Sequence, residues 1–168
     1  LEYRGYDSAG IATISENNIN EVKCEGRVNE LEKNVNQINL SGTIGIGHVR
    51  WATHGKPSTI NAHPHSSDNV SVVHNGIIEN STILKKILEK KGYKFKSQTD
   101  TEVIVHLVTD YLKKNNLKDT IIKVLKKLHG SFALGIIFKD QPDLIIGARR
   151  GSPCLLYTSP SPRDPKIS

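Results

Sequence analysis

The chain has 168 residues, of which 36% are hydrophobic and 24% charged, as expected for one globular domain with its own core. No run approaches the roughly 20 apolar residues of a membrane-spanning helix, and no apolar signal core is found near the start, so we expect a cytoplasmic protein. The net charge of +6 raises the possibility of a nucleic-acid partner. The lysines, however, lie on predicted amphipathic helices and only 5% of residues are aromatic, which argues against nucleic acid.

Alternating apolar residues predict strands in the first half of the chain. The first two strands are residues 9–15 and 19–24, which flank a polar turn at residues 16–18. Two further strands are predicted at residues 42–50 and 69–74. A short polar turn between two strands is typical of a hairpin, so we expect antiparallel pairing.

Helical spacing of apolar residues follows. Residues 80–91 are predicted to form a helix, with Asn80 as its N-cap and Gly92 as its stop. Thr99 and Glu102 have the spacing of a capping box, which predicts a second helix directly after them.

A third helix is predicted at residues 117–128, followed by a hairpin of residues 131–138 and 144–149. Strands at both ends with helices between them indicate an α+β layered domain.

The two ends of the chain have distinctive compositions. The sequence contains no methionine and begins at Leu1, so we expect a fragment of a longer polypeptide. Residues 154–168 change abruptly to a Pro/Ser-rich run, which we interpret as a non-native or disordered tail. The expected domain covers residues 1–153. A disulfide between Cys24 and Cys154 is not expected, because Cys154 lies in that tail.

Polar side chains that could bind a ligand or take part in catalysis are concentrated in residues 50–55, directly after a predicted strand. Arg50, Trp51, Thr53 and His54 supply a cation, an indole, a hydroxyl and an imidazole, which are typical of a lid over a small polar ligand. Arg50 can clamp a carboxylate through two parallel hydrogen bonds. A surface salt bridge explains Arg50 equally well at this point.

The pair Asn75–Gly76 ends an apolar run and allows two interpretations. Asn-Gly is the strongest short hairpin signal. Alternatively, the Asn75 amide and the Gly76 backbone N–H form an oxyanion hole for a developing negative charge. The apolar residues that follow weaken the hairpin interpretation, because no returning strand follows them.

Five histidines between positions 48 and 74 raise a metal-site hypothesis. No cysteine lies nearby and Asp68 is the close carboxylate, while loop histidines bonded to the backbone explain the pattern as well. A non-enzymatic, histidine-rich metal-binding module therefore stays an alternative.

Several segments occur in the order in which one known family has them. They are EYRGYDSAG at residues 2–10, HVRWATHG at 48–55, NAHPH at 61–65, VHNGIIEN at 73–80 and TDTEV at 99–103. Over residues 1–153 the chain resembles the isomerising glutamine:fructose-6-phosphate aminotransferases.

The resemblance implies a class II glutamine amidotransferase domain of the N-terminal nucleophile hydrolase fold. This α+β fold is a four-layer sandwich with two antiparallel sheets between helical layers, and its first strand and helix are expected to be missing here. In that family an N-terminal cysteine attacks the glutamine side-chain amide, with its own α-amine as base. This sequence does not contain that cysteine, so the chain by itself is expected to be inactive.

Residue roles also follow from the resemblance. Asn75 and Gly76 are implied as the catalytic oxyanion hole. Arg50 is implied to hold the glutamine α-carboxylate and Asp100 its α-ammonium group. The other implied contacts, from a covering loop and a supporting residue, are Trp51, Thr53, His54 and Arg4.

The resemblance further implies glutamine as substrate and a sugar-phosphate isomerase domain in the same parent polypeptide, which forms a homo-oligomer. It implies neither a cofactor nor a metal. The alternative within the fold is another class II amidotransferase, of the amidophosphoribosyltransferase or asparagine synthetase type. Tyr6–Asp7 and residues 50–55 favour the sugar-phosphate enzymes.

Overall fold

The computed structural model describes residues 7–38, 40–51 and 55–152. Their strands form two antiparallel sheets. Sheet A has the order β2 (Asn18–Glu25), β1 (Ser8–Ser15) and β3 (Ile44–Arg50). Sheet B has the order β4 (His65–Ser66), β5 (Val70–Ile78), β6 (Gly130–Phe138) and β7 (Gln141–Arg150).

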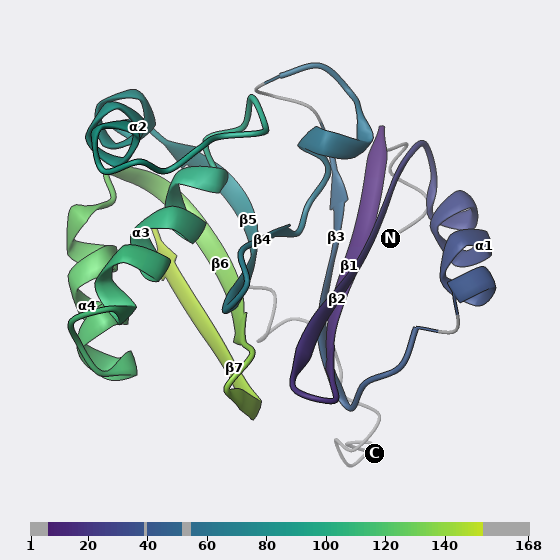
Figure 1. Ribbon diagram of the computed structural model, residues 1–168. Coiled ribbons are helices and arrows are strands. Elements are labelled where there is room, and N and C mark those ends of the chain that lie inside the picture. The colour runs from purple at the N-terminus through teal and green to yellow at the C-terminus, as the bar shows by residue number, and fades with distance from the viewer. Residues whose placement is uncertain (1–6, 39, 52–54, 153–168) are drawn as a thin grey trace, which may run out of the picture.

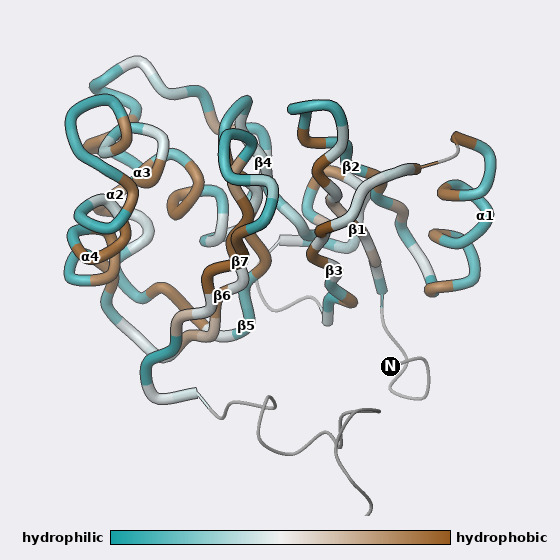
Figure 2. Tube along the Cα trace, turned by 90° about the horizontal axis from the view of Figure 1, so that it is seen from below, coloured by the Kyte–Doolittle hydropathy of each residue, from teal (hydrophilic) through white to brown (hydrophobic). Residues whose placement is uncertain are grey.

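Helices cover the outer faces of the two sheets. They are α1 (Val28–Ile38), α2 (Ser81–Lys90), α3 (Glu102–Leu112) and α4 (Leu117–Lys127), and a short 3-10 helix, η2, spans Thr59–Asn61. Helices α2, α3 and α4 lie on the outside of sheet B, and α1 lies on the outside of sheet A (Figure 1). The view from below shows the same order of layers (Figure 2). The predicted α+β sandwich, with two antiparallel sheets between helical layers, is confirmed.

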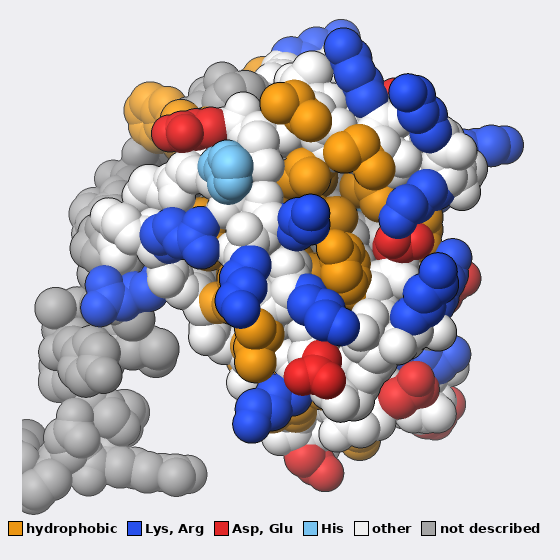
Figure 3. All heavy atoms as spheres, turned by 90° about the vertical axis from the view of Figure 1, so that its left-hand side faces the viewer, with side chains coloured by type: hydrophobic (Ala, Val, Ile, Leu, Met, Phe, Trp, Pro, Cys, Tyr) orange, Lys and Arg blue, Asp and Glu red, His pale blue; other side chains and the backbone are white. Residues whose placement is uncertain are grey.

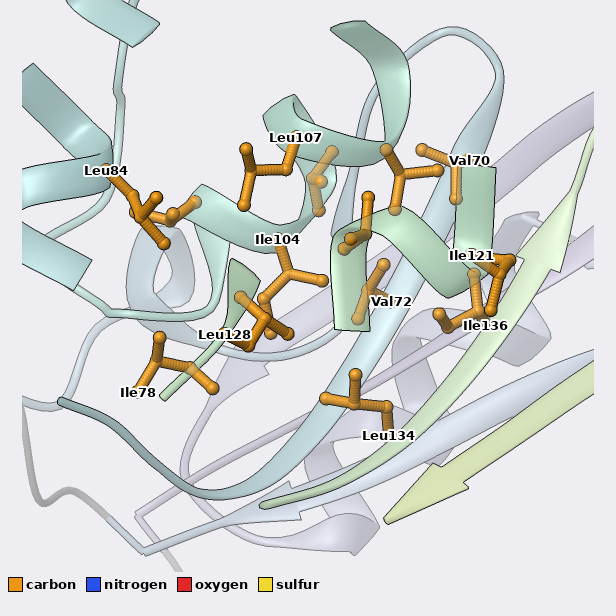
Figure 4. Packing of buried hydrophobic residues seen from close by; sticks show 14 of the residues in the cluster. Val70, Val72, Ile78, Leu84, Ile104, Leu107, Ile121, Leu128, Leu134 and Ile136 are labelled. Atoms are coloured by element: carbon orange, nitrogen blue, oxygen red, sulfur yellow. The ribbon is translucent and has the colours of Figure 1, made fainter. Parts of the chain in front are cut away.

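The larger core lies between sheet B and its helices (Figure 4). Val70 and Val72 alternate along β5 on the face toward the helices, as the period of a strand requires. Helix α3 contributes buried residues along most of its length, because it lies between the sheet and the two other helices. This packing fixes the start of α3, where Asp100 lies, against β5.

A smaller apolar cluster fills one part of the space between the sheets. It consists of Ala12, Ile14, Ile46 and Ile137, with Val73 packed against it. Ile46 and His48 lie on the same face of β3, since side chains two residues apart share a face. The space between the sheets therefore changes from apolar to polar along β3.

Most predicted elements form close to their expected positions. The first hairpin pairs Ile14 with Ile19, and its turn places Glu16 and Asn17 at positive φ, as the favoured hairpin turns require. The helix predicted at residues 80–91 is α2, and Gly92 follows it with φ +90°. None of the helices within the described ranges is long and apolar enough to cross a membrane.

Helix α1 is the element that the sequence pattern did not reveal. It contains no buried residue, and its apolar side chains form only a thin stripe between asparagines and charged residues. Asparagine has a low helix propensity, so the segment resembles a loop until sheet A supplies a packing surface.

The hairpin interpretation of Asn75–Gly76 is wrong, because both residues lie inside β5, which continues to Ile78. Gly76 has φ +119°, and a Cβ at this position would lie 2.1 Å from the carbonyl oxygen of Ser131. Glycine is therefore required by the close approach of β6 rather than by a turn.

Lysines decorate the outer helical layer, as expected from the helical spacing. They surround exposed apolar side chains of α2, among them Ile83 and Ile87 (Figure 3). Only 5% of the residues of the chain are aromatic, and Tyr111 lines this surface together with the lysines of α4.

Candidate active site

Side chains alternate along β5, so the neighbouring residues His74 and Asn75 point to different layers. Val73 packs into the cluster between the sheets, and Asn75 lies on the same strand face. The Asn75 Oδ1 atom lies 2.9 Å from Nε2 of His48 on β3. His74 points to the opposite face, where its Nδ1 lies 2.9 Å from Oγ1 of Thr101, just before α3. Asn75 is therefore held from sheet A, and His74 from the helical layer.

Arg50 is the last residue of β3 and is only 4% exposed. Its Nη2 donates to the carbonyl oxygen of Gly55 at 3.2 Å, and its Nη1 lies 3.9 Å from Oδ1 of Asp7. Arg50 is thus a buried cation whose ion pair with Asp7 lies below the surface rather than on it. Trp51, the next residue, is 65% exposed.

The remaining sequence-predicted residues of this loop, Thr53 and His54, lie outside the described residues, and so does Arg4. Their implied roles stay predictions.

A buried asparagine connects the Arg50 loop to the Asp100 loop. Asn61 donates through Nδ2 to the carbonyl oxygen of Lys56 at 2.9 Å, and its Oδ1 accepts from the backbone N–H of Gln98 at 2.9 Å. Gly55 approaches Gln98 so closely that a Cβ on Gly55 would lie 2.9 Å from Cβ of Gln98. The loop that accepts from Arg50 and the loop that leads to Asp100 are thus one packed unit.

Asp100 caps the open edge of β5. Its Oδ2 accepts from the backbone N–H of Ile78 at 2.7 Å, and its Oδ1 lies 3.9 Å from Nδ1 of His74. Strand β4 pairs only with Ser71 and Val72, so it does not reach this part of the edge. A carboxylate bonded through one oxygen keeps lone pairs for a further partner.

The predicted capping box before α3 is wrong in its geometry. Helix α3 begins at Glu102 with Thr101 as N-cap, and Thr99 makes no capping bond to it. The Glu102 carboxylate instead accepts from the backbone N–H groups of Lys96 and Ser97. Burial raises the pKa of Glu102, but the nearby His106 ring, 3.5 Å away, and these bonds outweigh it and lower the pKa to about 2. Glu102 therefore acts as a charged clamp on the loop before Asp100.

Four histidines gather where the two sheets and α3 meet. The ring of His63 lies 4.5 Å from that of His48, 4.9 Å from that of His65 and 6.5 Å from that of His74, measured between centroids. The Thr101 hydroxyl lies within hydrogen-bond distance of both His63 Nε2, at 2.7 Å, and His74 Nδ1. One hydroxyl donates a single proton, so it donates to one imidazole and accepts from the other.

Burial disfavours the charged form of three of these imidazoles, those of His48, His63 and His65. It lowers the pKa of His63 well below its ordinary value and that of His65 to about 3. It also lowers the pKa of His48, although the bond to Asn75 opposes this effect. Within the part of the chain that the structure describes, no group of three or more His, Cys, Asp or Glu residues is arranged to hold a metal ion. The rings pack against each other and against hydroxyls instead.

The contacts of His48, Asn61 and Thr101 were not predicted from the sequence. All three lie in the segments that carry the family resemblance, which was the available signal. Their partners are 27 to 38 residues away for the histidine and threonine bonds, and sequence spacing does not reveal such pairs.

Comparison with known families supports an amidotransferase. The model of a family described as "Glutamine amidotransferase domain" matches residues 49–163. This range contains Arg50, Asn75, Gly76 and Asp100.

Two curated relatives share the name glutamine–fructose-6-phosphate aminotransferase [isomerizing]. The protein from Clostridium acetobutylicum is 54% identical over 161 residues, which are 95% of this chain and 26% of the relative. The protein from Bradyrhizobium diazoefficiens is 53% identical over 154 residues, covering 91% of this chain and 25% of the relative. The chain thus spans about a quarter of the length of the curated relatives it matches.

Solved structures share the fold. Glutamine phosphoribosylpyrophosphate amidotransferase from B. subtilis has a TM-score of 0.68 at 33% identity, covering 83% of this chain and 30% of that protein. A structure described as the allosteric regulatory enzyme of purine biosynthesis has a TM-score of 0.69 at the same identity, covering 83% and 31%. The predicted N-terminal nucleophile hydrolase fold is confirmed by these neighbours. The chain belongs to the glutamine amidotransferase domain family.

Proposed function

We propose that this chain forms the glutamine-hydrolysing part of an isomerising glutamine–fructose-6-phosphate aminotransferase. The chain is 54% identical to a relative of that name and 33% identical to the phosphoribosylpyrophosphate amidotransferase structure, which favours the sugar-phosphate enzyme. In this proposal, transfer of the released ammonia to fructose 6-phosphate belongs to sequence outside this chain. The proposed enzyme is a cytoplasmic homo-oligomer.

Recognition of free glutamine is proposed for Arg50 and Asp100. An α-amino acid carries a carboxylate and an ammonium group at a fixed separation, so its site needs one cation and one anion. Arg50 is 4% exposed and the Asp100 side chain 10% exposed. Charge-assisted bonds are stronger in such partly desolvated places than in water.

Stabilisation of the reacting oxygen is proposed for Asn75 and Gly76. Attack of a thiolate on the glutamine side-chain amide places negative charge on the amide oxygen, which two fixed donors stabilise. Successive backbone N–H groups of a strand point to opposite edges. Gly76 therefore shares its edge with Ile78, whose N–H meets Asp100. The Gly76 N–H and the Asn75 amide are proposed to act together as the oxyanion hole.

The proposed nucleophile is the N-terminal cysteine that the family resemblance implies, and neither Cys24 nor Cys154 is proposed to take its place. Cys24 is unsuited to this role. It is buried in β2, and burial raises the pKa of its thiol, so the reactive thiolate is disfavoured.

The observation that carries the proposal is the single network of contacts that connects the loops of Arg50 and Asp100 with Asn75. Its test is Asn75→Ala in a polypeptide of the relatives' full length that contains this chain, called here the full-length protein. Glutamate release should fall by roughly 100-fold to 1,000-fold in kcat, with little change in KM for glutamine, as for loss of one oxyanion donor. Asn36→Ala, an exposed position on α1, is the matched control and should leave both constants unchanged.

Two results would contradict the proposal in different ways. A raised KM with unchanged kcat in Asn75→Ala would make Asn75 a binding contact rather than an oxyanion donor. Glutamate release with no glucosamine 6-phosphate formed from fructose 6-phosphate would instead place the chain in another amidotransferase.

A further inference from the structure

We infer that His48 is a positioning residue that holds the Asn75 carboxamide with its NH2 group toward the reacting oxygen. The inference deepens the proposed function and rests on the oxyanion role of Asn75. His48 itself does not contact glutamine in this proposal. It acts through the orientation of one side chain.

A carboxamide can rotate by a half turn, which exchanges an acceptor for two donors. In the present orientation Oδ1 of Asn75 faces Nε2 of His48 at 2.9 Å. Oδ1 can only accept, so His48 donates and Nδ2 stays available for the substrate. In the flipped orientation Nδ2 would be used by His48, and Oδ1 would repel a developing oxyanion. The proton on Nε2 of His48 therefore decides whether Asn75 stabilises or opposes the transition state.

The His48 ring packs beside the segment that carries His63. Its neighbour His63 lies 4.5 Å away between ring centroids, and His63 Nε2 lies 2.7 Å from the Thr101 hydroxyl. Strand pairing places His48 opposite Gly10 of β1. A Cβ added to Gly10 would lie 2.3 Å from the carbonyl oxygen of His63. The segment that carries His63 is thus pressed against sheet A beside His48. A ring fixed in this way can select one orientation of Asn75.

The competing explanation is that the His48–Asn75 contact only stabilises the packing of the two sheets. Variants of His48 that differ in hydrogen-bonding capacity distinguish this explanation from a positioning role. His48→Gln keeps a side-chain N–H donor at the same number of bonds from Cα. His48→Leu fills a similar volume without a donor. His48→Glu offers only acceptors when ionised, so it attracts Nδ2 of Asn75 and favours the flipped amide.

The experiment measures glutamate release by these variants in the full-length protein. We expect kcat for His48→Leu to fall roughly 10-fold to 100-fold, part of the loss for a deleted oxyanion donor, while KM for glutamine stays within about twofold. His48→Gln should recover most of the rate, and His48→Glu should be slower than His48→Leu. In an Asn75→Ala background, His48→Leu should lower kcat no further, because a positioning residue has nothing left to position.

The outcomes distinguish the inference from the function on which it rests. If Asn75→Ala lowers kcat but His48→Leu does not, or if their effects multiply, the positioning role is overturned while the oxyanion hole stands. If the wild-type protein releases no glutamate, the proposed function fails and the inference with it. Equal losses in His48→Leu and His48→Gln, with matching losses in thermal stability, show a structural contact only. His129→Leu, on the exposed surface after α4, should leave kcat unchanged.

Discussion

The carboxylate of Asp100 accepts a 2.7 Å hydrogen bond from the backbone N–H of Ile78. One side chain thus has two tasks, since it completes the edge of β5 and supplies the anion proposed to bind the glutamine ammonium group. The same bond fixes the distance between the start of α3 and the strand that carries Asn75. The binding charge and the strand of the proposed oxyanion hole therefore cannot move independently.

The two tasks of Asp100 separate in a pair of variants. Asp100→Asn keeps an acceptor for the Ile78 N–H and removes the charge, whereas Asp100→Ala removes both. We expect Asp100→Asn to raise KM for glutamine roughly 10-fold to 100-fold, equivalent to one charge-assisted bond, with little change in melting temperature. Asp100→Ala should raise KM similarly and also lower the melting temperature. An unchanged KM in both variants would remove Asp100 from glutamine binding.

Gly76 is expected to be intolerant of any side chain. Gly76→Ala places a Cβ at 2.1 Å from the Ser131 carbonyl oxygen and forces alanine to φ +119°. Backbone strain of this kind is typically about 1–3 kcal/mol before the clash is counted. Gly147→Ala on β7 is the matched control, because nothing lies within 4 Å of its Cβ position. Urea unfolding should show a large loss of stability for the first variant and almost none for the second.

Thr101 and Thr120 form a contrasting pair of fully buried threonines. The Thr101 hydroxyl serves His63 and His74, whereas the Thr120 hydroxyl has no hydrogen-bond partner among the described residues. Thr101→Val should lower the free energy of unfolding by about 1–3 kcal/mol, because it leaves buried imidazole groups unsatisfied. Thr120→Val should be neutral or stabilising. Chemical denaturation of the two variants tests this, and equal effects would show that the shared hydroxyl has no special role.

Acid should destabilise the fold through His48, His63 and His65. Their pKa values are lowered by burial, that of His65 to about 3, whereas the unfolded chain has histidines near the ordinary pKa of about 6.5. As the pH falls below about 6.5, these histidines become protonated in the unfolded state but not in the folded state, so the free energy of unfolding decreases. Each such histidine contributes up to about 1.4 kcal/mol per pH unit. The contribution of Glu102, whose pKa is also lowered, is lost only at lower pH, between its ordinary value and about 2.

The measurement is the free energy of unfolding in urea between about pH 7.5 and pH 4. His65→Gln should flatten the pH dependence in this range, and His129→Gln, at an exposed position, should not. Stability that stays constant down to about pH 5 would contradict the burial of neutral histidines.

The sequence by itself determined the elements whose apolar periodicity is strong. The helices at residues 80–91 and 117–128 and the first hairpin follow from spacing and end signals that each segment carries. Ordered motifs further predicted the family and the fold class, because several segments in one order are far more specific than any single one. Helix α1 was not predicted, because its thin apolar stripe stabilises a helix only when sheet A provides a surface to pack against.

Only the tertiary structure decided which partners the polar residues contact. Asn75–Gly76 has the local signature of a turn, but pairing with β6 continues the strand through both residues. The close approach of Ser131 requires the glycine. Thr99 and Glu102 have the spacing of a capping box, but other partners take their side chains. The bond from His48 to Asn75 joins two sheets whose strands are distant in sequence. Periodicity reports burial along one segment, whereas such contacts depend on how separate segments pack.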